Sequence, residues 1–246
     1  MSTSSSNILT KLQELNKKKG PVVFLPSLNK KVKFLPFTLR QQKNILAAMP
    51  EDASQVITFN KLFNNIIAEN CDDGVDVNSL NQFDRLAIVL AYRASSLGDT
   101  LDTEEGDVNI DDVIKKVTSY KYGKLFDTKN ITNRDITAEV SVPTIEYEEK
   151  INDAVSKLIN KDTPTNTIVS ELYISEILKF IKSIKIEKET ISLIEMSYDE
   201  KIQLIEALPG NFVKLIMKFI EEVKKVETEV TTVDGVKLDV SNQLFS

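Results

Sequence analysis

The side chains that most often carry catalysis or bind metals are nearly absent from this chain. It contains no histidine and a single cysteine, Cys71, among 246 residues. Without imidazole it lacks the group that titrates most readily near neutral pH and that most often binds metals. A Ser-His-Asp or Cys-His arrangement is therefore impossible within one chain, and one cysteine cannot build a zinc site. The two aspartates that follow Cys71 disfavour its thiolate form, so we do not expect a reactive thiol.

Acidic residues are the remaining candidates for chemistry. Asp72, Asp73 and Asp76 lie near a glycine in "DDGVDVN", but their order does not match the DxDxDG spacing of a calcium loop. The pairs Glu148-Glu149 and Glu221-Glu222 are more typical of solvated helix faces than of the two carboxylates of a glycosidase. The chain also lacks the GxxxxGK[ST] and GxGxxG nucleotide-binding patterns. We therefore predict that the protein is not an enzyme, and that it has no catalytic residues, no cofactor, no metal and no small-molecule substrate.

Composition predicts a globular protein. Hydrophobic residues make up 41% and charged residues 28% of the chain, a balance that suits a packed core. The formal net charge of −6 gives no reason to expect general binding to nucleic acid. No apolar run approaches the roughly 20 residues that cross a bilayer, and the polar first 20 residues lack a secretion signal. A soluble intracellular protein without a membrane or nucleic-acid partner is the expectation.

The first 98 residues predict an arm, a hairpin and three helices. The arm, residues 1–20, carries an apolar stripe at helical spacing, and it is either a frayed helix or a segment that orders on a partner. In residues 21–37, Val22, Phe24, Val32 and Phe34 are placed with the period of two that is typical of strands. The prolines of this stretch, Pro26 and Pro36, mark strand ends.

Helix signals follow the hairpin. Thr38 and Gln41 form a capping-box pattern that predicts a helix start, and this helix should end by Pro50. Apolar spacing predicts two further helices over residues 51–70 and 80–97, and Gly98 is the expected stop of the second.

The second half predicts a mixed connection and then a helical lobe. Residues 99–143 contain an acidic, loop-like stretch and one to three short strands. Ser197 and Glu200 form another capping box, and Asp234-Gly235 is a hairpin signal. The remaining segments predict helices over 145–160, 167–182 and 211–226, with a strand or bent pair over 183–196.

These elements predict an α+β fold that is mainly helical. We expect four parts: the arm at 1–20, a hairpin with a helical lobe at 21–98, a connecting segment at 99–143, and a helical lobe with a terminal hairpin at 144–246. The connecting segment could separate two lobes, or the chain could form one compact body.

Three fragments together resemble a known family. "LPSLNKKVKFLPFTLRQQKNIL" at 25–46 is similar to an opening pattern, "LPSTGKKVKFRPF", of the baseplate hub proteins of T-even-like contractile-tailed phages. A second fragment, 66–101, resembles that family's "DGVDVxxLxxFD" and "RxxSxG" patterns. The third comprises "VPTIEY" at 142–147 and the closing helix, Pro break, helix, "DG" turn and terminal Phe. The matching positions of the second fragment are Asp73, Gly74, Val75, Asp76, Leu80, Phe83, Asp84, Arg93, Ser96 and Gly98.

The resemblance implies a role in forming or assembling the baseplate hub, and it implies no reaction. The partners would be hub, tube, tape-measure or wedge subunits of the phage tail, and homo-oligomerisation is left open. The protein would be made in the host cytoplasm and found in the virion. The chain departs from some relatives in one respect, because "DTEEGDVNIDDVIKKVTSYKYGKLF" at 102–126 replaces a cysteine-rich insert. No metal-stapled element is therefore expected there.

Three functions follow from these observations. The first is a permanent structural subunit whose strand edges and Ser-rich arm contact neighbouring chains. The second is a transient assembly chaperone with an apolar groove lined by 83–94 or 212–223. The third, a hydrolase that uses two carboxylates, is disfavoured. The residues predicted to bind partners are Val22, Phe24, Leu25, Val32, Phe34, Phe37, Phe212, Leu215, Phe219, Leu244 and Phe245.

Overall fold

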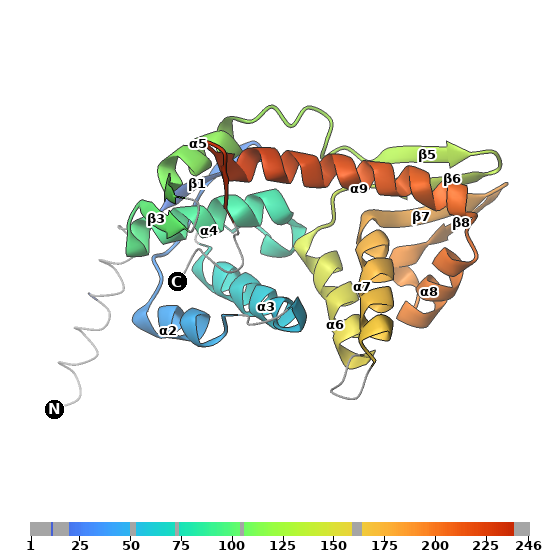
Figure 1. Ribbon diagram of the computed structural model, residues 1–246, viewed down its shortest axis with the longest axis horizontal. Coiled ribbons are helices and arrows are strands. Elements are labelled where there is room, and N and C mark those ends of the chain that lie inside the picture. The colour runs from blue at the N-terminus through green and yellow to red at the C-terminus, as the bar shows by residue number, and fades with distance from the viewer. Residues whose placement is uncertain are drawn as a thin grey trace. The chain divides into compact units, whose positions relative to one another are not determined.

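The computed structural model describes residues 20–49, 53–71, 74–103, 106–158 and 164–238, together with Lys11. Its contacts divide the chain into two compact units, whose elements are labelled in Figure 1. Unit 1 holds the described residues as far as Tyr120 and those from Val230 on, and unit 2 runs from Lys121 to Glu229. Helices predominate and the strands form antiparallel sheets, so the predicted mainly helical α+β class is confirmed.

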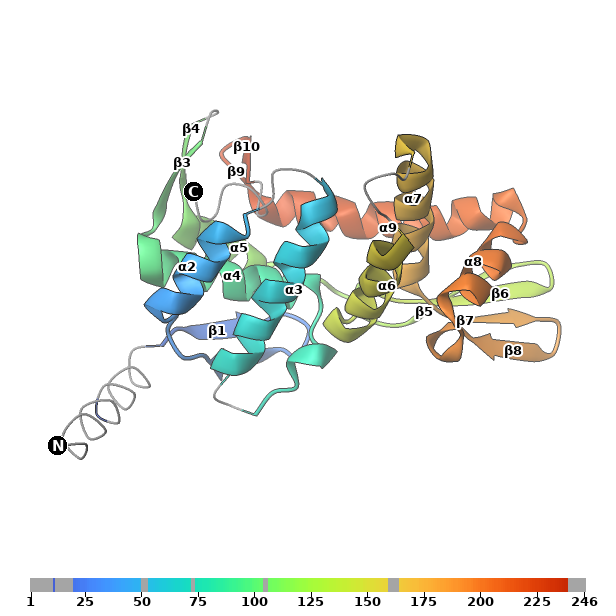
Figure 2. The same cartoon turned by 90° about the horizontal axis from the view of Figure 1, so that it is seen from below.

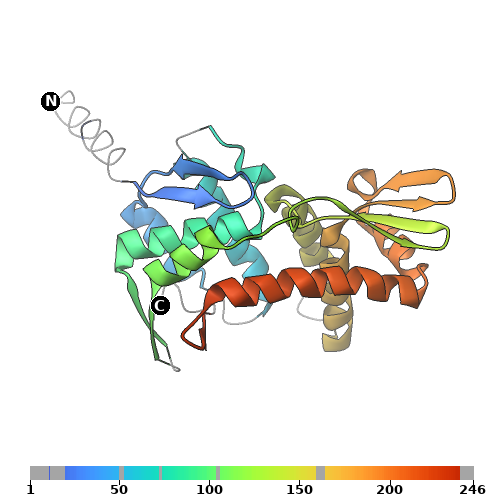
Figure 3. The same cartoon turned by 90° about the horizontal axis from the view of Figure 1, so that it is seen from above.

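Unit 1 combines helices with two-stranded β-hairpins. The strands pair antiparallel as β1–β2, β3–β4 and β9–β10. The β1–β2 hairpin lies beside α4, against which β1 packs (Figure 3). The elements of this unit are, in chain order, β1 (Val22–Leu25), β2 (Lys30–Lys33), α2 (Leu39–Ala47), α3 (Ala53–Asn70), the 3-10 helix η1 (Val77–Ser79), α4 (Gln82–Leu97), β3 (Thr100–Thr103), β4 (Gly106–Asn109), α5 (Ile110–Ser119), β9 (Thr232–Val233) and β10 (Val236–Lys237).

An aromatic cluster fills the centre of unit 1. The rings of Phe37 and Tyr92 stack with centroids 3.7 Å apart, and Phe34 meets Tyr92 edge-on at 6.1 Å. Phe63 on α3 packs against Phe37, so the cluster joins α3, α4 and the segment that follows β2. The hydroxyl of Tyr92 donates a hydrogen bond of 2.9 Å to the carbonyl of Leu35, which satisfies the polar end of a buried ring.

Unit 2 is a four-stranded antiparallel sheet with helices. The strand order is β5-β6-β7-β8, and α6 and α7 pack side by side (Figure 2). The elements are β5 (Lys129–Asn133), β6 (Ile136–Val140), α6 (Ile145–Leu158), α7 (Thr165–Phe180), β7 (Ile181–Ile186), β8 (Glu189–Ser192), the 3-10 helix η2 (Leu193–Glu195), α8 (Tyr198–Glu206) and α9 (Gly210–Thr231), whose last two residues belong to unit 1.

The faces of this sheet differ in chemistry. The strand register places Ile131, Ala138, Ile184 and Ile191 across one face, and Ala138 and Ile184 are fully buried. The opposite face carries two cross-strand rows of polar side chains, because every strand alternates between the faces. These rows are Asn130, Glu139, Ser183 and Ser192, and then Thr132, Thr137, Lys185 and Thr190.

Capping chemistry fixes several helix starts. The predicted capping boxes at Thr38 and Ser197 are both confirmed, since each hydroxyl accepts from the third helical N–H while the side chain of that residue binds back. Asn81 and Asp84 form a further box at the start of α4. The predicted terminal hairpin is also confirmed: Asp234 and Gly235 both adopt positive φ between β9 and β10, as a tight two-residue turn requires.

The connecting segment differs from the prediction. The acidic stretch interpreted as a loop forms the β3–β4 hairpin, and residues 110–119 form helix α5. Asn109 caps this helix, Asp111 and Asp112 favour its N-terminus, and Ile110, Val113 and Val117 form its buried face. The unit boundary falls at Tyr120, inside the predicted connection, and the chain returns to unit 1 at Val230.

Candidate interaction surfaces

The exposed face of the β1–β2 hairpin combines apolar and basic side chains. The register pairs Val22 with Lys33 and Phe24 with Lys31, and residues paired in this way project from the same face. Val22 is 63% exposed, Phe24 is half-buried and Lys31 is exposed. We call this group of four residues the outer hairpin face. The part of the chain that the structure describes contains no third strand paired with either β1 or β2. Directly after β2, Phe34 forms an isolated antiparallel bridge with Cys71.

The register separates the four residues of the predicted period-of-two pattern, because Val32 and Phe34 lie on the face of the hairpin opposite Val22 and Phe24. Val23, Leu25, Val32 and Phe34 are the buried side chains, each no more than 3% exposed. The four consecutive apolar residues "VVFL" of β1 contain no polar alternation that could identify the inner face. The register does so instead, because Val32 lies between lysines and is paired with Val23.

Asp84 fixes this hairpin to α4. Its carboxylate accepts hydrogen bonds from the backbone N–H of Ser27, at 2.9 Å, and from the Ser27 hydroxyl. It also accepts from the backbone N–H of Asn81 at 3.1 Å. Asp84 is fully buried, and this burial raises its pKa although all three hydrogen bonds act in the opposite direction. These hydrogen bonds hold the turn between β1 and β2 at the N-terminus of α4.

Gly20 allows the chain before β1 to pass close to the backbone of Phe34. At Gly20 a Cβ would lie 1.7 Å from the carbonyl oxygen of Phe34, so no larger residue fits without moving the backbone. This contact lies next to the hydrogen bond from the Phe34 N–H to the Pro21 carbonyl, which extends the β1–β2 pairing by one step.

The predicted partner-binding residues occupy different environments. Val22 is the most exposed of them in the described chain, and Leu25, Val32, Phe34 and Phe37 are buried in unit 1. Leu244 and Phe245 lie outside the described residues. The role of these residues in partner binding stays a prediction, and only a rearrangement would bring the buried ones to a partner's surface.

The α9 residues are mostly covered. Phe212 is fully buried, Phe219 is 5% exposed and packs edge-on against Phe180, and Leu215 is half-buried. The ammonium of Lys129 lies 4.9 Å from the Phe219 ring centroid and pairs with Glu222 at 3.0 Å. The apolar faces of 83–94 and 212–223 are likewise buried, so neither lines an open groove in this structure.

Other apolar side chains are exposed on both units. Leu39 and Leu46 are on α2 and are 68% and 52% exposed. Val169 and Tyr173 are one turn apart on α7 and are 60% and 53% exposed. Sequence reasoning did not single these residues out, because each belongs to a helix whose spacing predicts only that some apolar residues face inward.

Neither a metal-binding cluster nor a membrane-spanning helix is found among the described residues. Within the described ranges no group of three or more acidic or cysteine side chains could hold a metal ion. Asp76 caps η1 by accepting from the N–H of Asn78 at 3.0 Å, whereas Asp72 and Asp73 lie outside the described residues. The Cys71 thiol is half-buried and 3.7 Å from the carbonyl of Val75. None of the described helices is both long and apolar enough to span a membrane.

Comparison with known proteins identifies the family. A model of the T4 bacteriophage base plate protein family matches residues 19–237. The chain belongs to this family. Searches of curated proteins and of solved structures gave no match. Membership of the T4 bacteriophage base plate protein family indicates a structural role in the phage baseplate, implies a location in the virion tail, and implies contacts with other tail proteins. The resemblance seen in the sequence is confirmed at this level.

Proposed function

We propose that this chain is a non-enzymatic structural component of the central hub of the baseplate, and that it acts through contacts with neighbouring tail proteins. The family match over residues 19–237 is the observation on which the proposal depends. The sequence adds the resemblance to hub proteins at residues 25–46, which include the whole turn and second strand of the β1–β2 hairpin.

The outer hairpin face is the proposed contact surface. It is held in place by the hydrogen bonds of Asp84 to Ser27 and by the buried side of the hairpin. A rigid surface loses little conformational entropy on binding. Its apolar part, Val22 and Phe24, would be covered by the partner, while Lys31 and Lys33 favour a partner surface that carries acidic residues.

Subassembly analysis tests the hub assignment. Baseplate hubs, wedges and complete particles would be separated from infected cells and their proteins quantified by mass spectrometry. The proposal predicts this chain in the hub fraction and in complete particles at a fixed ratio to other hub proteins. Its presence in the wedge fraction alone would contradict the assignment.

A substitution tests the contact surface. Val22→Glu places a charge on the outer hairpin face at a site that is 63% exposed, so the fold should tolerate it. We expect at least a tenfold loss of incorporation into hubs, because a desolvated carboxylate would face the partner. Leu46→Glu is the matched control, since Leu46 is also in unit 1 and is 52% exposed. Equal incorporation of the two variants would exclude the outer hairpin face as the contact.

A transient assembly chaperone is the alternative function. The exposure of Val169 and Tyr173, one turn apart on α7, favours it, because a chaperone needs apolar surface that it can cover and release. This alternative predicts the chain in precursor hubs and its absence from mature particles. Its presence in mature particles in stoichiometric amount would exclude it.

A further inference from the structure

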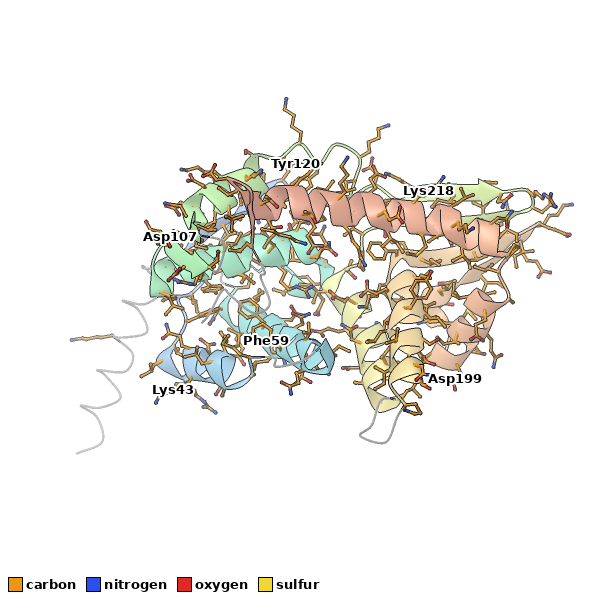
Figure 4. All side chains as sticks on the ribbon, viewed as in Figure 1. Lys43, Phe59, Asp107, Tyr120, Asp199 and Lys218 are labelled. Atoms are coloured by element: carbon orange, nitrogen blue, oxygen red, sulfur yellow. The ribbon has the colours of Figure 1, made fainter. Side chains whose placement is uncertain are left out.

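Lys201 occupies a position on α8 that would ordinarily hold an apolar side chain. It is one helical turn from Ile205 on the same face, and the two residues are 6% and 5% exposed. Figure 4 labels Asp199, two residues earlier on this helix. Lysine is almost never buried to this extent unless its ammonium group has an acidic partner.

The ammonium group of Lys201 has no acidic partner among the residues that the structure describes. Within the described chain it takes part in no hydrogen bond and no ion pair, and its nitrogen lies 5.2 Å from the centroid of the Tyr147 ring on α6. A cation–π contact offsets only part of the cost of removing an ammonium group from water. Among the described residues, the cation thus contacts an aromatic ring and has no anion beside it.

A second lysine adds to the positive charge. Burial, and then the nearby charge of Lys150, lower the pKa of Lys201. No carboxylate of the described residues opposes this lowering. Lys150 follows Tyr147 by about one turn on α6 and is exposed. Its ammonium group pairs with the carboxylate of Glu146 at 2.6 Å.

We propose that Lys201 binds a carboxylate of a partner protein, supplied by an aspartate, a glutamate or a chain terminus. A carboxylate beside the Lys201 ammonium group would accept a charge-assisted hydrogen bond from it and supply the opposite charge. The covered stem of Lys201 and the Tyr147 ring fix the direction of one donor before binding, which limits the entropy lost. The inference rests on the proposed function, according to which the partner is a protein. It gives unit 2 a partner contact in addition to the outer hairpin face of unit 1.

Acetate serves as the probe for the site itself. In the full chain with labelled lysine side chains, acetate should shift the NMR signal of the Lys201 Cε group in a saturable way, whereas chloride at equal ionic strength should not. Lys201→Met removes the charge and keeps an apolar stem, so its melting temperature should equal or exceed that of the wild type. Lys157→Met is the matched control, because Lys157 is exposed on the same helix as Lys150 and should leave the acetate response unchanged.

Phage complementation tests the partner contact. We expect Lys201→Met to fold and yet to reduce incorporation into baseplates at least tenfold, whereas Lys157→Met assembles normally. An unsaturable acetate response, or normal incorporation of Lys201→Met, would overturn the inference. The hub assignment can fail while the carboxylate site holds. This would be the result if the wild-type chain lay outside the hub but still showed the acetate response and a partner contact that depends on Lys201.

Discussion

At the scale of single residues, the buried carboxylate of Asp84 fixes the turn of the first hairpin to the start of α4. It accepts from the N–H and hydroxyl of Ser27 and from the N–H of Asn81. Asp84→Ala would leave these buried donors unpaired, so we expect the free energy of unfolding to fall by about 3 kcal/mol. Denaturant titration measures this loss. Asp107→Ala, at an exposed position of β4, should change the free energy of unfolding by less than about 0.5 kcal/mol. A loss below about 1 kcal/mol for Asp84→Ala would contradict the described role.

The same carboxylate predicts a pH dependence. Burial raises the pKa of Asp84 above its ordinary value of 3.8, so the folded chain binds this proton more readily than the unfolded chain. The proton-linked part of the contribution of Asp84 to stability is therefore fully present below pH 3.8 and is lost as the pH rises through the raised pKa. Compared with Asp84→Asn, which does not titrate, the wild type should gain free energy of unfolding as the pH falls from 7 toward 4. A pH-independent difference between the two would show that the pKa is not raised.

Residue-scale features were the hardest to predict from the sequence. The period of two in the first hairpin indicated a strand pair, but it did not show that Val23 and Leu25 are the residues of β1 that the structure buries. Lys201 was not recognised as an inward-facing cation, since its neighbours give a normal helix pattern. Its spacing of four from Ile205 was the available signal, but burial of a lysine depends on what packs above it.

At the scale of elements the sequence was more informative, because helix starts depend on local hydrogen bonds. Thr38 and Ser197 were identified as caps from three-residue spacing alone, and the structure confirms both. Helix α5 was missed because its many β-branched residues are also typical of strands. The packing of Ile110, Val113 and Val117 decides its conformation, and this packing involves residues distant in the sequence.

These caps predict different losses of stability. Asn81 is 6% exposed and its side chain accepts from the N–H groups of Phe83 and Asp84, whereas Thr38 is exposed. Water can replace the lost oxygen only at the exposed cap. We expect Thr38→Ala to cost about 0.5–1 kcal/mol and Asn81→Ala about 2 kcal/mol of unfolding free energy. Thermal unfolding of both variants checks this order, and a larger loss at Thr38 would contradict it.

At the scale of the whole molecule, the chain forms two units of which only one is continuous in sequence. Unit 2, residues 121–229, contains its own four-stranded sheet with buried Ala138, Val140, Ile181 and Ile184. We predict that this segment folds when expressed alone, because its core is formed from residues within it. Circular dichroism and cooperative thermal unfolding of the fragment test the prediction. A fragment without a cooperative transition would show that unit 2 depends on unit 1.

The division into units could not be predicted from composition. The sequence left open whether the segment 99–143 separates two lobes, and the return of residues 230–238 to unit 1 depends on tertiary contacts. One of these is the hydrogen bond from the Lys116 ammonium to the Thr232 carbonyl, between residues more than a hundred positions apart. Family membership, in contrast, was visible in the sequence, because it depends on short ordered patterns over most of the chain.

We propose that this member of the T4 bacteriophage base plate protein family works as a structural part of the hub. Cryo-electron microscopy of purified baseplates tests it most directly, since the four-stranded sheet of unit 2 and the long helix α9 give a recognisable density. The account predicts that density in the central hub, with the outer hairpin face against a neighbouring protein. Density confined to the wedges, or no density for this chain in any baseplate, would contradict it.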